Sequence, residues 1–261
     1  MKQQDSFWVW AGAAGALLVA GAVGVYYFYQ RAPQPASDAP AVVEAPRTAA
    51  PVEEPPVAVT TLPPEPEIPL PPLDESDADV GGGLTEIFGR EAVEQYLVPE
   101  RIVRNIVVTI DNLPREKMAL QQRPIRPTPG EFLTGGPEDA IVLAPENYER
   151  YAPFVQVLTA ADAKTLVSMY RGLQPLFQQA YEELGHPNNL FNARLLEVID
   201  HLLATPEPKG PVRLLQPGVF YKYADEELER LSAGQRLLIR MGPENAAAVK
   251  AKLREIQAEL I

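Results

Sequence analysis

The fold class depends on residues 101–112, which read RIVRNIVVTIDN. The β-branched run at 106–110 is typical of a strand. However, the polar residues at 101, 104, 105 and 112 fall on one face of a helix, and the apolar residues fall on another. Pro99 lies where a helix can begin, because its missing N–H is not needed there. The polar spacing favours a helix, and a strand is the alternative.

A second helical pattern covers residues 166–184, where apolar residues recur at alternating spacings of four and three. We expect a long amphipathic helix that opens at the capping motif in residues 159–162 and ends at Gly185, a typical left-handed cap. Pro175 lies inside this helix. Its ring clashes with the carbonyl group four residues earlier, so we expect a kink there.

Three more helices are expected towards the C-terminus. Residues 190–203 carry two overlapping apolar stripes, so this helix should be buried on most sides, at the domain centre, with Asn189 as its cap. Ser232 and Gln235 form a capping box that opens a second helix, and Gly242 ends it before the third begins at Pro243. The third helix places four apolar residues on one face, namely Val249, Leu253, Ile256 and Leu260.

Shorter elements complete the domain. Residues 84–97 predict one or two short helices around Gly89, and residues 146–158 predict a helix interrupted by Pro153. Two turn motifs, at residues 135–137 and 216–218, predict small hairpins. The fold class is therefore mainly α with a minor α+β character: one mostly helical globular domain, residues 84–261, with one or two short β-hairpins.

Residues 32–83 have a different composition. They hold thirteen of the 28 prolines, and ten carboxylates against the single Arg47. Proline pairs exclude helices and sheet ladders, and few large apolar residues are present, so we expect a disordered linker with polyproline II character. The three glycines at 81–83 are expected to form a flexible joint before the domain. This linker carries most of the net charge of −12, so the basic footprint of a nucleic-acid-binding protein is missing.

The N-terminal region, residues 1–31, contains a 23-residue uncharged stretch at residues 7–29, FWVWAGAAGALLVAGAVGVYYFY. A membrane-crossing helix needs about 20 apolar residues, and the aromatic residues at both ends suit the two headgroup regions. The alternative is a cleaved signal peptide, whose apolar core is shorter, so we expect a retained anchor. Small residues recur every four positions, which would let a second anchor approach closely and form a homodimer: Gly12, Ala16, Ala20 and Gly24.

The flanking charges give a weak orientation signal. Lys2 precedes the anchor and an acidic tract follows Arg31, so the positive-inside bias favours a cytoplasmic N-terminus. The expected location is therefore the bacterial inner membrane, with a single pass and a periplasmic C-terminal domain. The chain has no cysteine, which excludes disulfides and thiolate metal sites.

The sequence offers no catalytic, cofactor-binding or metal-ligating motif. It has neither a phosphate-binding loop nor a nucleophile elbow, and its two histidines, His186 and His201, have simpler readings as a loop or capping residue and a helix-surface residue facing Glu197. One basic cluster is a candidate contact for an anionic wall polymer or an acidic partner. The alternative is pairing with the chain's own acids. The cluster consists of Arg115, Lys117, Arg123 and Arg126.

Several stretches identify a family resemblance: IVVTIDNLPREK, NYERYAPFV, YRGLQPLFQQAYEELG, FNARLLEVIDHLL and LSAGQRLLIRMGPEN. Over about residues 84–261 the chain resembles the bacterial domain of unknown function 3014. The resemblance implies an envelope protein with an anchor and a proline-rich linker, and it supplies no catalytic residues. The expected function is a non-enzymatic, membrane-tethered scaffold or adaptor that binds another envelope component. The alternative is a periplasmic enzyme that acts on a cell-wall polymer through paired carboxylates.

Overall fold

The stretch that decides the fold class forms a helix, α3, which spans Ile102–Asn112. Nine of its eleven residues are buried, including every member of the β-branched run. A β-branched residue costs a helix only a few tenths of a kcal/mol relative to the best helix formers. Burial of one large aliphatic side chain contributes about 1.5–3 kcal/mol. Tertiary burial therefore outweighs the local strand preference, and the helical reading is confirmed.

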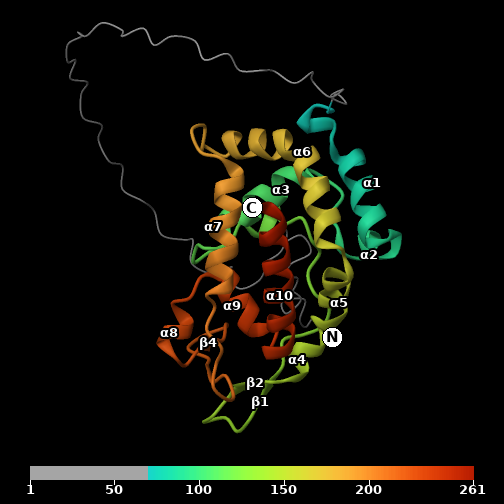
Figure 1. Ribbon diagram of the computed structural model, residues 1–261. Helices are drawn as coiled ribbons and strands as arrows, with labels where there is room; N and C mark the ends of the chain where they lie inside the picture. Colours follow the sequence, from blue (N-terminus) through green and yellow to red (C-terminus); the bar gives the residue numbers. More distant parts are fainter. Residues whose placement is uncertain (1–69) are drawn as a thin grey trace, which may run out of the picture. The chain divides into compact units, whose positions relative to one another are not determined.

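The structure, a computed structural model, describes residues 70–261 (Figure 1). The predicted anchor with its small-residue face, and the linker up to residue 69, lie outside this range. None of the helices in the described range has the length and apolarity needed to cross a membrane. The elements of this part are η1 Leu73–Glu75, α1 Asp77–Phe88, α2 Arg90–Tyr96, α3, η2 Leu120–Gln122, β1 Thr134–Gly135, β2 Val142–Leu143, α4 Glu146–Glu149, α5 Ala152–Ala160, α6 Ala163–Glu183, α7 Phe191–Leu203, β3 Leu214–Leu215, β4 Lys222–Tyr223, α8 Glu226–Glu229, α9 Ala233–Arg240 and α10 Pro243–Leu260.

The folded part begins before residue 84, where the sequence suggests the boundary. The three glycines at 81–83 lie inside α1 and do not form a joint. Of the three, Gly83 comes closest to another helix: a Cβ there would stand 2.8 Å from the Cε at the end of the Met169 side chain on α6. Asp77 joins the start of α1 to the start of α3, because its carboxylate accepts the backbone N–H groups of Arg101 and Ile102, at 2.6 and 2.7 Å.

The long helix α6 forms as expected, although it begins later. Its cap is Asp162, whose Oδ1 accepts the backbone N–H of Thr165 at 2.7 Å, while Thr159 belongs to α5. Pro175 lies within α6, and Figure 1 shows the helix changing direction partway along its length. Gly185 follows with a φ of 106°, which confirms the predicted left-handed position.

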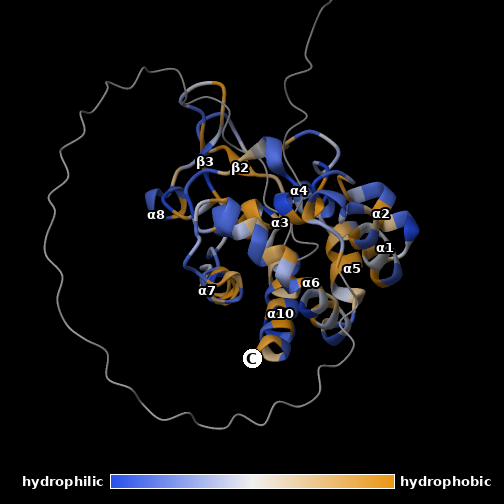
Figure 2. Cartoon of the chain, turned by 90° about the horizontal axis from the view of Figure 1, so that it is seen from above, coloured by the Kyte–Doolittle hydropathy of each residue, from blue (hydrophilic) through white to orange (hydrophobic). Residues whose placement is uncertain are grey.

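The helix at 191–203, α7, does not occupy the domain centre. It buries one face, while Glu197 and Asp200 are exposed, and Figure 2 shows it at the margin of the helices with α3 between it and α1. Two of the apolar residues expected to be buried, Leu196 and Leu203, are only half-buried. Asn189 is not its cap: the first N–H, of Phe191, is accepted by the Oε1 of Gln178 at 2.9 Å.

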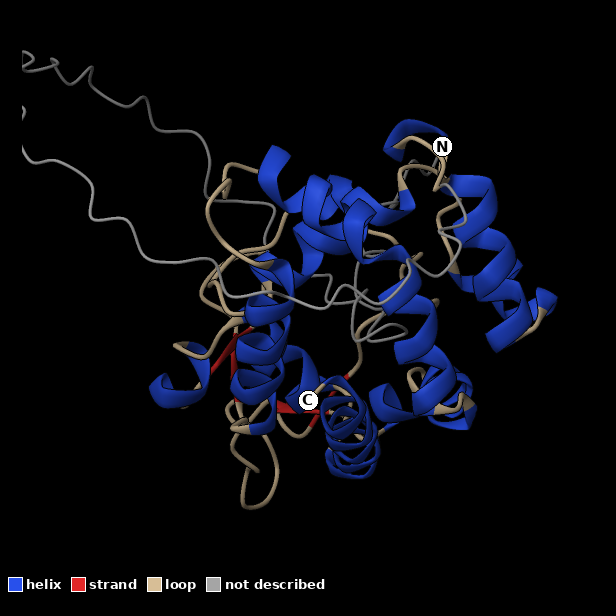
Figure 3. Cartoon of the chain, turned by 45° about the horizontal axis from the view of Figure 1, so that its top comes forward, coloured by secondary structure: helices blue, strands red, loops and turns tan. Residues whose placement is uncertain are grey.

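Both predicted hairpins are present and antiparallel, and each of their strands has two residues. Thr134 pairs with Leu143 in the first, and Leu214 pairs with Tyr223 in the second. A single bridge between Val142 and Arg213 joins them, and Figure 3 shows the strands gathered on one side of the helices. They surround a small second core formed by Leu143, Val212, Leu214, Tyr223 and Ile239.

The C-terminal helices agree with the sequence pattern. The capping box at Ser232 opens α9, and all four predicted apolar residues of α10 are buried. Two lysines of α10 are also buried. The Nζ of Lys250 donates to the carbonyl of Thr205 at 2.7 Å, and that of Lys252 donates to Ala161 at 2.9 Å. These carbonyls follow the ends of α7 and α5, so the lysines satisfy acceptors that helix ends leave open.

His201 connects α7 to α9, and the charge of Glu197 also acts on it. Its Nε2 lies 2.8 Å from the Oγ of Ser232, the cap of α9, and its carbonyl accepts from Gln235 at 3.2 Å. Burial, with a smaller contribution from Arg194, lowers the pKa of His201 below its usual 6.5. The folded protein therefore favours the neutral imidazole, whose lone pair can accept a hydrogen bond from the serine hydroxyl.

This shift predicts a pH dependence of stability. Below about pH 6.5 the unfolded chain binds a proton at His201 more readily than the folded chain does, so stability is full above that pH and falls as pH decreases through it. The His201→Gln variant should lose less free energy of unfolding between pH 7.5 and pH 5 than the natural protein, as measured by urea titrations. His186→Gln is the matched control. If His201→Gln kept the full pH dependence of stability and His186→Gln lost it, the prediction for His201 would be wrong.

Candidate functional site

The four basic residues singled out by the sequence do not share one set of contacts. Arg115 pairs with Asp111 and lies in the segment that bonds to α9. Arg126 donates to the carbonyl of Glu94 and lies in the segment that bonds to the end of α2. Arg123 is half-buried, which lowers the pKa of its guanidinium, and Lys117 is exposed.

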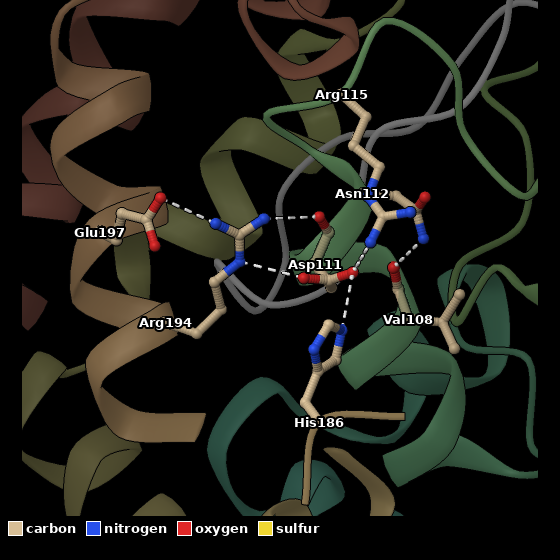
Figure 4. Close-up of polar contacts among 7 residues, drawn as sticks. All are labelled: Val108, Asp111, Asn112, Arg115, His186, Arg194 and Glu197. Carbon is tan, nitrogen blue, oxygen red and sulfur yellow. Dashed lines mark hydrogen bonds and ion pairs between the residues drawn. The ribbon is translucent and has the colours of Figure 1, made fainter. Parts of the chain in front are cut away.

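Arg115 belongs to a different group of charges, centred on a buried carboxylate (Figure 4). The side chain of Asp111 is only 3% exposed. Its Oδ1 accepts from the Nε of Arg194 at 3.0 Å, and its Oδ2 accepts from Arg115 and lies 3.8 Å from the Nε2 of His186. Arg194 also donates from Nη1 to Glu197 at 2.8 Å. These five residues are called the Asp111 cluster.

Three helices position the Asp111 cluster. Asp111 lies in the last turn of α3, and the Nη2 of Arg194 on α7 donates to its backbone carbonyl at 3.0 Å. A guanidinium at this end of a helix satisfies an open carbonyl and faces the negative end of the helix dipole. His186 follows the left-handed Gly185 at the end of α6, and its ring stacks on Tyr181 with a centroid distance of 4.6 Å.

The electrostatics of the cluster follow from burial. An isolated buried carboxylate is costly, and the two guanidinium groups offset that cost because they are charged and hydrogen-bonded. Burial alone lowers the pKa of Arg194, but its hydrogen bond to Glu197 and the charge of Asp111 outweigh this and raise it. Burial, assisted by the charge of Asp111, also raises the pKa of Tyr181. The charged form of Arg194 is thus favoured.

The cluster reaches the surface beside exposed apolar side chains. The side chain of Arg115 is 54% exposed, although Asp111 beneath it is buried. Leu190, which is 67% exposed, lies one turn before Arg194 on α7, and Leu184 is exposed at the end of α6. Leu190 is therefore one helical turn from Arg194, and the part of the cluster that reaches solvent most is the side chain of Arg115.

A separate cleft lies between α1, α2 and α5. It contains about 330 Å³ of empty space that is open to solvent, and it is lined by Leu84, Phe88, Ala92, Val93, Tyr96, Leu97, Ile125 and Val157. Its lining is apolar except for the tyrosine hydroxyl, so it offers no charged side chain for polar chemistry. Within residues 70–261 no three His, Cys, Asp or Glu side chains are grouped to hold a metal ion.

Sequence reasoning found Arg115 but missed Asp111, His186 and Arg194 as its neighbours. Two local signals for the cluster are present in the sequence. Asp111 and Arg115 are four residues apart on a helical pattern, and Arg194 and Glu197 are three apart. Neither signal indicates that the two pairs meet, because that contact depends on how α3 and α7 pack.

The comparisons with known proteins place these residues within a family. The sequence model described as "Protein of unknown function (DUF3014)" matches residues 102–257, which include the whole Asp111 cluster and exclude α1 and α2. No curated protein and no solved structure matched the chain. The family match spans more than half of the sequence and confirms the resemblance seen in the motifs. The chain therefore belongs to the DUF3014 family.

Proposed function

We propose that this chain is a non-enzymatic cell-envelope adaptor, and that its helical domain binds another envelope component at the Asp111 cluster. One observation carries the proposal: side chains from α3, α7 and the turn between α6 and α7 converge on one buried carboxylate at a surface that also exposes Leu184 and Leu190. Arginine beside apolar side chains is characteristic of protein-binding surfaces.

The tethered architecture is part of the same proposal. The uncharged stretch at residues 7–29 supports a single inner-membrane anchor, and the weak charge bias around it supports a periplasmic domain. The proline-rich linker supports a domain held away from the membrane, because proline and like charges extend a chain. An adaptor needs this combination of a fixed end and a distant binding surface.

The enzymatic alternative has less support. A carboxyl general acid needs a pKa raised towards neutrality. Within residues 70–261, two carboxyl groups have a shifted pKa, Asp162 and Glu183, and both are lowered, caused first by hydrogen bonds from Thr165 and Arg104 respectively. These are the shifts of a helix cap and of an ion pair, so neither group is suited to act as a general acid.

Site-specific photo-crosslinking in cells tests the proposal. A photoreactive residue at position 190 of the full-length chain should capture one recurrent envelope component. Leu215, which is 55% exposed on a hairpin, is the matched control and should not capture it. Equal capture from both positions, or capture of nothing by position 190, would contradict the assigned surface. Capture of cytoplasmic proteins alone would reverse the proposed topology.

A further inference from the structure

We infer that the two β-hairpins bind a second copy of this chain, with the acidic hairpin of each copy facing the basic hairpin of the other across a two-fold axis. Hairpin 1 is defined as residues 131–143 and hairpin 2 as residues 209–223, so that each includes the flanking segment that carries part of its charge. This interface is separate from the Asp111 cluster, and the inference therefore goes beyond the proposed function.

The two hairpins lie side by side, and their turns project from the same end. The N–H of Leu214 donates to the carbonyl of Ile141 at 2.8 Å, next to the antiparallel bridge between the hairpins. This antiparallel contact places the turn that precedes Ile141 beside the turn that follows Leu215, at the lower end of the domain in Figure 1. The hairpins also meet through the rings of Phe132 and Tyr221, whose centroids are 5.7 Å apart. One surface therefore contains residues of both hairpins.

Hairpin 2 exposes apolar side chains on this surface. Leu215 is 55% exposed, and Val219 in the turn is 49% exposed. Leu214 and its strand partner Tyr223 face the second core. Because successive strand residues face opposite sides, the next pair in the ladder, Leu215 and Lys222, lies on the outer face. A second molecule that covered this face would remove exposed apolar area from water, which favours association.

The two hairpins carry opposite charges. Hairpin 1 has three acidic residues and no basic one, whereas hairpin 2 has three basic residues and no acidic one. Within residues 70–261, no ion pair joins the two hairpins. All six charged residues are exposed, namely Glu131, Glu138 and Asp139 on hairpin 1, and Lys209, Arg213 and Lys222 on hairpin 2.

Opposite charges on neighbouring hairpins make this surface complementary to itself. A two-fold axis in the plane of the interface would bring hairpin 1 of each copy opposite hairpin 2 of the other. Each acidic turn would then face a basic hairpin, with Leu215 covered between them. An anionic lipid surface would attract hairpin 2 but repel hairpin 1. A second copy satisfies both hairpins at once, so it is the occupant that the charges favour.

Thiol crosslinking of the full-length chain in detergent tests this interface. The chain has no cysteine, so Leu215→Cys introduces its only thiol. A short bismaleimide should link two copies of this variant about tenfold more efficiently than two copies of Leu190→Cys, because the thiols of paired copies are held close together. Leu190→Cys is the matched control, since Leu190 is the more exposed of the two leucines and lies on α7.

Charge reversal in the chain with the cysteine at position 215 tests the two-fold arrangement. Glu138→Lys with Asp139→Lys reverses hairpin 1. Lys209→Glu with Arg213→Glu reverses hairpin 2. Each reversed chain alone should give about tenfold less crosslinked dimer, which corresponds to about 1.4 kcal/mol. An equal mixture of the two reversed chains should recover the yield as mixed dimers, because every contact between hairpins then joins opposite charges again.

The matched control for charge reversal is Glu91→Lys with Glu94→Lys, which reverses two exposed acids of α2 and should leave the yield unchanged. Three outcomes would overturn the inference: equal crosslinking from positions 215 and 190, reversed chains that crosslink as well as the unreversed chain, and a mixture that recovers no dimer. The last would show that hairpin charges meet something other than a second copy. Each variant keeps the Asp111 cluster, so capture by a photoreactive residue at position 190 tests the adaptor proposal separately.

Discussion

Asp111→Ala is expected to lower the free energy of unfolding by about 3 kcal/mol. Removing one partner of a buried ion pair typically costs about 3–5 kcal/mol, because the other charge loses its counter-ion. Here the remaining charges are partly accessible, since the side chains of Arg194 and Arg115 are 18% and 54% exposed. The lower end of that range therefore applies. The backbone carbonyl of residue 111 would still accept from Arg194.

Urea unfolding at neutral pH measures this loss, and Glu197→Ala is the matched control. Glu197 also pairs with Arg194, but it is exposed, so its removal should cost less than about 0.5 kcal/mol. Asp111→Asn keeps an acceptor for Arg194 without the charge, so its loss in the free energy of unfolding should lie between those of the two alanine variants. If Asp111→Ala were no more destabilising than Glu197→Ala, the carboxylate would not be the centre of the cluster.

Comparing Asp111→Ala with Arg115→Gln separates the effect on folding from the effect on binding. Asp111 orients Arg115, so the alanine variant should also lose capture of the partner by a photoreactive residue at position 190. Arg115→Gln removes the exposed cation but leaves Asp111 in contact with Arg194 and His186. It should therefore reduce affinity with little change in stability. Loss of both stability and binding at residue 111, beside loss of binding alone at residue 115, would show that the buried carboxylate supports the fold and that the exposed guanidinium contacts the partner.

Elements that depend on near neighbours in the sequence were predictable. The capping box at Ser232 and Gln235 needs only a spacing of three, and Gly185 ends α6 through its own backbone conformation. The helical identity of α3 was also readable from its polar spacing. Its central position was not, because burial depends on which helices pack around it. The two apolar stripes of α7 resembled those of a central helix, yet only one face is covered.

The glycines at 81–83 show why local preference fails at a packing contact. In isolation they predict a flexible joint, because glycine loses much conformational freedom in a helix. In the fold all three lie inside α1, the small size of Gly83 leaves room for Met169 of α6, and Asp77 joins the start of α1 to the start of α3. The Asp111 cluster follows the same rule. Its members are up to 86 positions apart in sequence numbering, and the domain holds many charged pairs of equal local spacing, so only the packing of α3 against α6 and α7 selects this one.

Gly242→Ala should be more destabilising than Asp111→Ala, with an expected loss of about 4 kcal/mol in the free energy of unfolding. Gly242 links α9 to α10 with φ of 83° and ψ of 164°, a region that is essentially restricted to glycine. A Cβ at this position would also lie 2.4 Å from the Cγ of Tyr148. The tyrosine cannot easily move, since Asn245 donates to its carbonyl at 2.9 Å and its ring packs on the second core.

Gly89 separates the two causes, because it has almost the same backbone conformation without the collision. Its φ and ψ are 83° and 152°, and a Cβ there would have no neighbour within 4 Å. Gly89→Ala therefore measures backbone strain alone, about 1–3 kcal/mol. The difference between the two variants, measured by urea unfolding, isolates the contact with Tyr148. If the two alanine variants were equally destabilised, the ring would have moved aside, and the junction between α9 and α10 would depend only on the backbone conformation of the glycine.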